Sequence, residues 1–214
     1  MKHFFSIIFI FTFSVCYCFA YDTPDFFDAK LEQSALQFNK IKNHETFKSK
    51  KNHKINWTYI AADKAKYAKP LGTVIISPGR TESSLNWMEY SLALRNKGYS
   101  VAIIDHLGQG QSERLTPQSD KGHIDFFETY VEDFNLFLSR VKHRLAGPYF
   151  LIANSMGAPI ALLEDTSAIE KIILHAPMFK IKTAPLPYFL GSFFSFFLSV
   201  ILKLFLRLLL VISI

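Results

Sequence analysis

The middle of the chain alternates between short apolar runs and longer segments with helical spacing. Apolar runs bounded by turn residues are typical of buried strands, whereas apolar residues that recur every three or four positions indicate helices. Strands and helices that alternate along a chain predict a mostly parallel sheet with helices on both faces. We expect strands over residues 45–47, 55–60, 72–76, 100–104, 149–153 and 171–174, and helices over residues 87–96, 124–145 and 156–165.

Residues 1–20 follow a different pattern from the rest of the chain. Lys2 and His3 are followed by an apolar run and then by the small residue Ala20. This order is the layout of a secretory signal peptide, so we expect cleavage after Ala20 and export across the inner membrane, to a periplasmic, secreted or membrane-associated state. An uncleaved anchor is the alternative, although the apolar run is shorter than the ~20 residues that span a bilayer.

Both cysteines, Cys16 and Cys18, lie in this N-terminal segment. Its removal would leave a chain without thiols, which excludes disulfides, a cysteine nucleophile and cysteine-bound metals. We therefore expect neither a metal nor a cofactor.

The composition, with 50% hydrophobic and 20% charged residues, is that of a folded chain and not of a disordered one. The net charge of +6 comes partly from residues 48–54, which we interpret as a solvated turn between two strands. Nucleic-acid binding would need basic residues on one face with aromatic stacking partners, so we expect no nucleic-acid partner. An anionic membrane surface is the better partner for this charge.

The strongest chemical signal is Ala-Asn-Ser-Met-Gly at residues 153–157, between an expected strand and an expected helix. Functional groups collect at the carboxyl ends of parallel strands. A serine on a sharp strand-to-helix turn holds its hydroxyl above the sheet, and the residues two positions away must be small, as Ala153 and Gly157 are. Ser155 is therefore a candidate nucleophile, and a serine in an ordinary tight turn is the alternative.

A second loop follows the expected strand 72–76 and contains Gly79. Acyl transfer needs two backbone N–H donors that converge on the oxyanion, one of them from the residue after the nucleophile. We expect Met156 to supply one donor and Arg80 the other, with Gly79 permitting the close turn. The alternative is an ordinary Pro-Gly turn at the end of a strand.

Five segments resemble, in order, the bacterial lysophospholipases related to monoacylglycerol lipases, within the α/β-hydrolase superfamily: VIISPGRTES, IIDHLGQGQSERL, GHIDFFETYVEDF, LIANSMGAPI and LHAPMF. The resemblance covers roughly residues 47–190. It implies an α/β-hydrolase fold with a helical cap after the sixth strand. It also implies a serine nucleophile, a histidine base and an aspartate that orients the base, acting on lysophospholipids or monoacylglycerols.

Carried over residue by residue, the resemblance matches Ser155 to the nucleophile, and Arg80 and Met156 to the oxyanion donors. Two small departures are Ala153, where glycine is commoner, and Ser-Pro-Gly at residues 77–79, where the superfamily often has His-Gly. The resemblance implies structural roles for the glycine-rich loop residues Gly108, Gly110 and Ser112, and a packing and hydrogen-bonding role for His123.

The triad acid and base are missing from their usual place after Ser155. Asp165 ends the expected helix 156–165, about 15 Å from Ser155 along the helix axis, and so cannot orient a base beside the nucleophile. We interpret His175, the only histidine after Ser155, as a polar strand-end residue, with a substitute general base as the alternative. His106 precedes the serine and matches no role in the family.

Residues 185–214 begin like the family's cap and continue as a very apolar tail. The tail has three interpretations: a truncated or frameshifted end, a membrane-associating or membrane-spanning segment, and a complete soluble cap helix. Lys203 and Arg207 would each cost ~2.5–3.5 kcal/mol near the centre of a span, although their spacing also suits an interfacial helix.

We therefore expect a signal peptide over residues 1–20, an α/β-hydrolase core over 21–184, and the start of a cap or an apolar tail over 185–214. The fold would be incomplete at its C-terminus, without the last strands. Two function classes remain open. One is a serine hydrolase of carboxylic esters whose activity is reduced or lost, and the other is a non-catalytic, membrane-associated α/β-hydrolase-like protein that binds lipid.

Overall fold

The structure is a computed structural model that describes residues 25–118 and 121–179. The chain divides into two units, Met1–Phe179 and Lys180–Ile214, and the description below concerns the first. The expected signal peptide over residues 1–20 and the tail over residues 185–214 lie outside the described residues.

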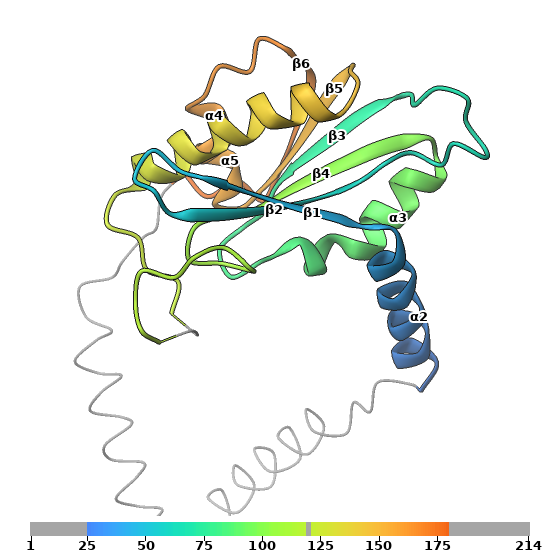
Figure 1. Ribbon diagram of the computed structural model, residues 1–214, viewed down its shortest axis with the longest axis horizontal. Helices are drawn as coiled ribbons and strands as arrows, with labels where there is room; N and C mark the ends of the chain where they lie inside the picture. Colours follow the sequence, from blue (N-terminus) through green and yellow to red (C-terminus); the bar gives the residue numbers. More distant parts are fainter. Residues whose placement is uncertain (1–24, 119–120, 180–214) are drawn as a thin grey trace, which may run out of the picture. The chain divides into compact units, whose positions relative to one another are not determined.

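The described strands form one sheet in the order β1-β2-β4-β3-β5-β6 (Figure 1). β2 pairs antiparallel with β1 and with β4, whereas β4, β3, β5 and β6 run parallel to one another. The mostly parallel sheet is therefore confirmed. The strands are β1 (Asn43–Lys48), β2 (Lys54–Ile60), β3 (Gly72–Ser77), β4 (Tyr99–Asp105), β5 (Tyr149–Asn154) and β6 (Ile169–His175).

Helices cover both faces of the sheet, as expected (Figure 1). Alternate strand residues point to opposite faces. Ile75 of β3 packs with Phe134 of α4 on one face, and its neighbours Val74 and Ile76 pack with Leu94 of α3 on the other. The helices are α2 (Asp25–Ile41), the short 3₁₀ helix η1 (Ser84–Trp87), α3 (Met88–Asn96), α4 (Phe127–Arg144) and α5 (Gly157–Leu162).

All three expected helices differ from their expected bounds, and one further helix was not predicted. α4 spans Phe127–Arg144 and not residues 124–145. α5 ends at Leu162, because Leu162 and Leu163 are exposed and the chain turns away before Asp165. The segment expected as one helix over 87–96 is an η1 turn followed by α3. The unpredicted helix α2 packs on α3 through the fully buried Phe38. Within the described ranges, no helix is both long and apolar enough to cross a bilayer.

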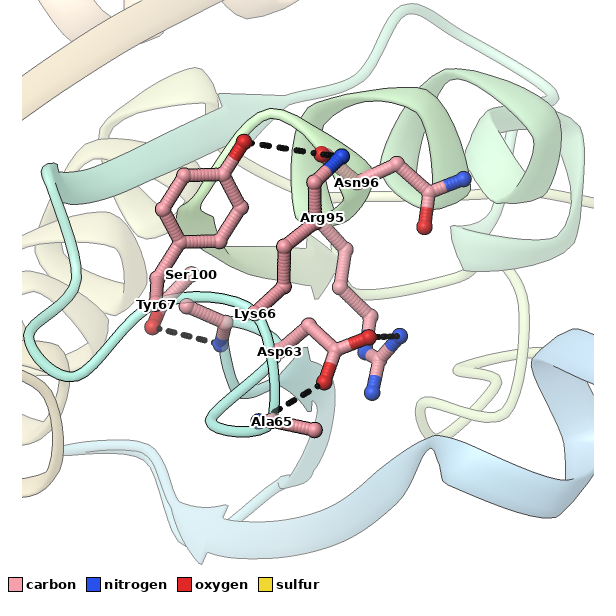
Figure 2. A network of polar contacts seen from close by, with 8 residues as sticks. Asp63, Ala65, Lys66, Tyr67, Arg95, Asn96 and Ser100 are labelled. Atoms are coloured by element: carbon pink, nitrogen blue, oxygen red, sulfur yellow. Dashed lines mark hydrogen bonds and ion pairs between the residues drawn. The ribbon is translucent and has the colours of Figure 1, made fainter.

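The loop between β2 and β3 is held to the end of α3 by a polar network (Figure 2). The Arg95 guanidinium lies 3.1 Å from Asp63 Oδ2. Lys66 Nζ and Tyr67 Oη each donate to the carbonyl oxygen of Asn96 at 3.2 Å. These contacts attach the long connection to the C-terminal end of α3, beside the residues where β3 and β4 begin.

The lysine-rich turn between β1 and β2 is exposed and lies against the start of α4, and the expected hairpin is confirmed. Lys51 Nζ donates to Thr129 Oγ1 at 3.2 Å and lies 4.9 Å from the centre of the Phe126 ring. Lys50 Nζ lies 3.7 Å from Glu132 Oε1. Part of the basic charge of this turn is therefore paired with α4.

Candidate active site

Ser155 occupies the turn between β5 and α5 with φ of +47°, a left-handed conformation that is uncommon for residues other than glycine. Backbone of this kind costs on the order of 1–3 kcal/mol and persists only where its surroundings hold it. Here Ser155 N donates to the carbonyl oxygen of His175 at 2.9 Å, and Ser155 O accepts from Met178 N at 3.1 Å. The end of β6 thus holds the strained turn, and the Ser155 side chain is half-buried.

Small residues on either side of Ser155 let the strand and the helix approach closely. A Cβ atom at Gly157 would overlap the carbonyl oxygens of Ser77 and Pro78 at the end of β3. Ala153 is fully buried in the core below the turn. The steric requirement that the sequence pattern implies is therefore present in the fold.

The loop after β3 lies directly against Ser155. A Cβ atom at Gly79 would lie 3.1 Å from Ser155 Cβ, and Arg80 is the next residue. Within residues 25–118 and 121–179, the backbone N–H groups of Arg80 and Met156 donate to no other group. The fold therefore brings together Ser155 and two unpaired backbone donors, all three of which were candidates from the sequence.

No histidine or carboxylate side chain of the described part of the chain hydrogen-bonds to Ser155 Oγ. His175 Nδ1 lies 2.7 Å from Asn154 Oδ1, so that ring is engaged with the residue before Ser155. Asp165 is exposed beyond the end of α5, where hydrogen bonding from Ser167 lowers its pKa. Asp165 therefore orients no base at the turn, as expected.

His106 lies fully buried beneath the turn and has a structural role that the sequence did not reveal. Its Nε2 is 3.1 Å from Ser77 Oγ, which in turn donates to the carbonyl oxygen of Gly157 at 3.2 Å. Burial lowers the pKa of His106 to about 3, so the ring is neutral near pH 7. A histidine directly after a buried strand was the available sequence signal. This neutral ring supports the contact between β3 and α5.

The glycine-rich loop after β4 is structural, as the resemblance implies. Gly108 and Gly110 have φ of +79° and +49°, and a Cβ atom at Gly110 would overlap the Asp105 carboxyl group. The buried Asp105 accepts a hydrogen bond from Ser84 N at 2.8 Å, and Ser112 Oγ donates to its carbonyl oxygen. The loop thus joins the end of β4 to η1.

His123 forms a hydrogen bond but does not pack in the interior. Its Nε2 lies 3.1 Å from Asp125 Oδ1, and both side chains are exposed. The expected hydrogen-bonding role is confirmed, whereas the expected packing role is not, because the His123 side chain is exposed and only its backbone lies beside Gly108.

A cavity of about 580 Å³ opens beside the loop after β3. Ser155 is not among its lining residues, and none of them is acidic. The cavity is lined by Arg80, Thr81, Gly108, Gln109, Gly110, Arg114, Lys121, Gly122, His123 and Tyr130. In the part of the chain that the structure describes, no cluster of three or more His, Cys, Asp and Glu side chains could hold a metal ion.

Glu82 is a further site residue that sequence reasoning missed. Its carboxylate accepts hydrogen bonds from Gly79 N at 2.7 Å and Asn154 Nδ2 at 2.8 Å. The available signal was an acidic residue three positions after Gly79, a spacing that lets a side chain close a turn onto the backbone. Glu82 therefore joins the loop after β3 to the residue before Ser155.

Known proteins resemble this chain over its core. Probable lysophospholipase L2 of Haemophilus influenzae is 34% identical over 136 residues, which are 62% of this chain and 42% of that protein. The monoglyceride lipase of Homo sapiens is 29% identical over 121 residues, 53% of this chain and 38% of that protein. A carboxyl esterase from Bacillus coagulans has a similar fold, with a TM-score of 0.53, 23% identity, and coverage of 63% of this chain and 44% of that chain.

The chain spans less than half the length of these similar proteins. The family profile described as "Serine aminopeptidase, S33" (Hydrolase_4) matches residues 68–211, which is more than half of the chain. Together with the parallel sheet and the strand-to-helix turn at Ser155, this match identifies the chain, which is similar in sequence to a lysophospholipase and a monoglyceride lipase, as a member of the Hydrolase_4 family of α/β-hydrolases.

Proposed function

We propose that this chain carries the nucleophile-bearing part of a hydrolase of carboxylic esters, with monoacyl glycerolipids as substrates. Ser155 is the nucleophile in this proposal, and the N–H groups of Arg80 and Met156 stabilise the oxyanion. The observation that carries it is the left-handed turn at Ser155, beside the N–H groups of Arg80 and Met156, which have no hydrogen-bond partner among the described residues. The names of the similar lysophospholipase and monoglyceride lipase support the substrate class.

In this reaction Ser155 Oγ attacks the ester carbonyl carbon, and the two N–H groups bind the oxygen that becomes negatively charged. The attack needs a base to accept the serine proton. The described residues place no such base on Ser155, and His175 is bound to Asn154. In this proposal, a group outside the described residues supplies the base. Without the base, oxyanion and binding effects alone leave roughly 10³–10⁴-fold acceleration over water.

The basic residues of the adjoining cavity favour lysophospholipids over monoacylglycerols. Arg80 and Lys121 line it, and Arg80 Nη2 donates to the carbonyl oxygen of Gly122 at 3.3 Å, which leaves further guanidinium donors. A phosphodiester would use such donors, because charge-assisted hydrogen bonds to phosphate are roughly twice as strong as neutral ones. A monoacylglycerol has no charged group for them.

The test is covalent labelling of the full 214-residue chain in detergent with a fluorophosphonate probe, followed by peptide mass spectrometry. We expect one slow adduct on Ser155, no adduct in Ser155→Ala, and wild-type labelling in the exposed control Ser167→Ala. Labelling that persists in Ser155→Ala would rule out Ser155 as the nucleophile. A chain that stays unlabelled while it binds lysophospholipid would support the non-catalytic lipid-binding alternative.

A further inference from the structure

The Glu82 carboxylate is hydrogen-bonded on both oxygens, and each oxygen faces a different strand end. Oε2 accepts from Gly79 N at 2.7 Å and from Trp87 Nε1 at 3.2 Å, both on the side of β3 and η1. Oε1 accepts from Asn154 Nδ2 at 2.8 Å, at the end of β5. Across the described residues no lysine or arginine pairs with Glu82, so its carboxylate is stabilised by hydrogen bonds from uncharged N–H groups.

The Asn154 side chain that contacts Glu82 is also hydrogen-bonded to His175, which fixes the orientation of its amide group. Asn154 Oδ1 lies 2.7 Å from His175 Nδ1, and a ring N–H there requires the amide oxygen to face His175. The amide Nδ2 must then face Glu82. One chain of hydrogen bonds therefore runs from the loop after β3, through Glu82 and Asn154, to the end of β6.

The loop itself is closed by the same residue. Glu82 N donates to the carbonyl oxygen of Gly79 at 3.4 Å, while the Glu82 side chain binds Gly79 N. The orientation of the Gly79 backbone sets the direction of the next N–H group, which belongs to Arg80. Since Gly79 also lies against Ser155, a small rotation of this loop would move the Arg80 N–H relative to Ser155 Oγ.

We propose that Glu82 is a positioning residue for the oxyanion site: it holds the Arg80 N–H at a fixed place beside Ser155 by binding Gly79 and Asn154 at once. This rests on the proposed function, in which Ser155 is the nucleophile and the Arg80 N–H is an oxyanion donor. The arrangement places a negative charge near a developing oxyanion, which by itself slows the reaction. The proposal therefore requires that the gain in position exceeds this electrostatic cost.

Glu82→Gln separates the two effects, because it removes the charge and keeps the size. A glutamine has one acceptor oxygen and an NH₂ group, so it can serve either Gly79 or Asn154 but not both. Loss of one oxyanion donor costs about 10²–10³-fold in rate. Glu82→Gln would displace the Arg80 N–H without removing it. We therefore expect it to lower the maximal rate of fluorophosphonate labelling by about 10-fold or more, with the probe's half-saturating concentration unchanged.

The matched control is Glu89→Gln, at an exposed glutamate in the first turn of α3. It should label at the wild-type rate. Trp87→Phe removes one of the three donors to Glu82 and should have a smaller effect than Glu82→Gln. Labelling of Glu82→Gln at or above the wild-type rate would overturn the proposal, because the charge and not the position would then dominate.

A second measurement does not depend on reactivity. By amide hydrogen exchange, we expect Gly79 N–H to be protected in the wild-type chain and to exchange about 10-fold faster or more in Glu82→Gln, with an unchanged melting temperature. Unchanged exchange at Gly79 would overturn the proposal. If the wild-type chain does not label at all, the proposed function fails, and the exchange result decides separately whether Glu82 holds the loop.

Discussion

Two buried ionisable side chains, Asp133 and His106, affect the stability of the fold in opposite ways as the pH changes. Asp133 of α4 is 1% exposed, and neither of its carboxylate oxygens has a hydrogen-bond partner among the described residues. Burial raises the pKa of Asp133 from 3.8 to about 7, whereas burial lowers the pKa of His106 from 6.5 to about 3. Both groups are therefore neutral in the folded chain over much of the acidic range, because burial penalises the charged form of each.

These pKa shifts act on stability in opposite directions. The contribution of Asp133 is fully present below pH 3.8 and is lost as the pH rises through about 7. The contribution of His106 is present above pH 6.5 and is lost as the pH falls toward about 3. Between about pH 4 and 6.5, Asp133 lowers the free energy of unfolding as the pH rises, whereas His106 raises it. Each effect amounts to about 1.4 kcal/mol per pH unit.

Asp133→Asn should reveal the effect of His106 on stability, because it removes the opposing contribution of Asp133 to the pH dependence of unfolding. We expect the free energy of unfolding of the variant, relative to wild type, to rise by up to about 1.4 kcal/mol per pH unit between about pH 4 and 7. Urea unfolding across that range measures the difference. Asp125→Asn, at an exposed position, is the control. A difference that does not change with pH would show that Asp133 does not titrate in this range.

The sequence predicted the candidate nucleophile and oxyanion donors, but not the residues that hold them in place. Ser155, Met156 and Arg80 could be named from the spacing of small residues around a serine and from a glycine loop, which are local constraints. The roles of Glu82 and His106 depend on partners at other strand ends, such as Asn154 and Ser77. Contacts of this kind leave no local pattern in the sequence.

At the scale of elements, the continuous apolar strands were predicted best. The buried strands β3, β4 and β5 were placed to within one residue at each end, since an apolar run ends where burial ends. Helix ends were less well predicted, because periodicity shows which face is buried and not where the chain turns. α5 ends three residues earlier than expected for this reason, at Leu162 and not at residue 165.

Helix α2 provides a direct test of one packing contact. Phe38 is fully buried against Ile60 of β2 and Leu92 of α3. We expect Phe38→Ala to lower the free energy of unfolding by about 3–5 kcal/mol, from lost burial and the cavity that remains. Leu36→Ala, on the same helix at a side chain that is 66% exposed, should change it by about 0.5 kcal/mol or less. Equal losses in chemical denaturation would mean that α2 does not pack on α3.

At the scale of the whole molecule, β6 is the least protected part of the sheet. Within the described ranges β6 pairs only with β5, and Ile173 and Leu174 are 58% and 38% exposed. An edge strand with exposed apolar residues can pair with another chain, and charged residues on such edges prevent this. In the described part of the fold, β6 is therefore an open edge of the sheet.

Ile173→Lys should reduce self-association of the purified chain and leave the melting temperature within a few degrees of wild type, because the Ile173 side chain already faces solvent. Sedimentation velocity over a concentration series measures the association. Leu162→Lys is the matched control, because Leu162 is an apolar side chain that is 44% exposed and belongs to helix α5 and not to a strand. Equal reduction by both variants would mean that general surface hydrophobicity, and not the edge of β6, drives association.

By itself the sequence determined the class of fold and the candidate nucleophile. Apolar strand runs that alternate with helical segments favour a layered α/β sheet, and a serine flanked by small residues suits a sharp strand-to-helix turn. Only the tertiary structure decided which side chains meet at that turn. Glu82 reaches Gly79 and Asn154, His106 becomes neutral beneath Gly157, and His175 binds Asn154 in preference to Ser155. Such pairings depend on how strand ends far apart in the chain are brought together.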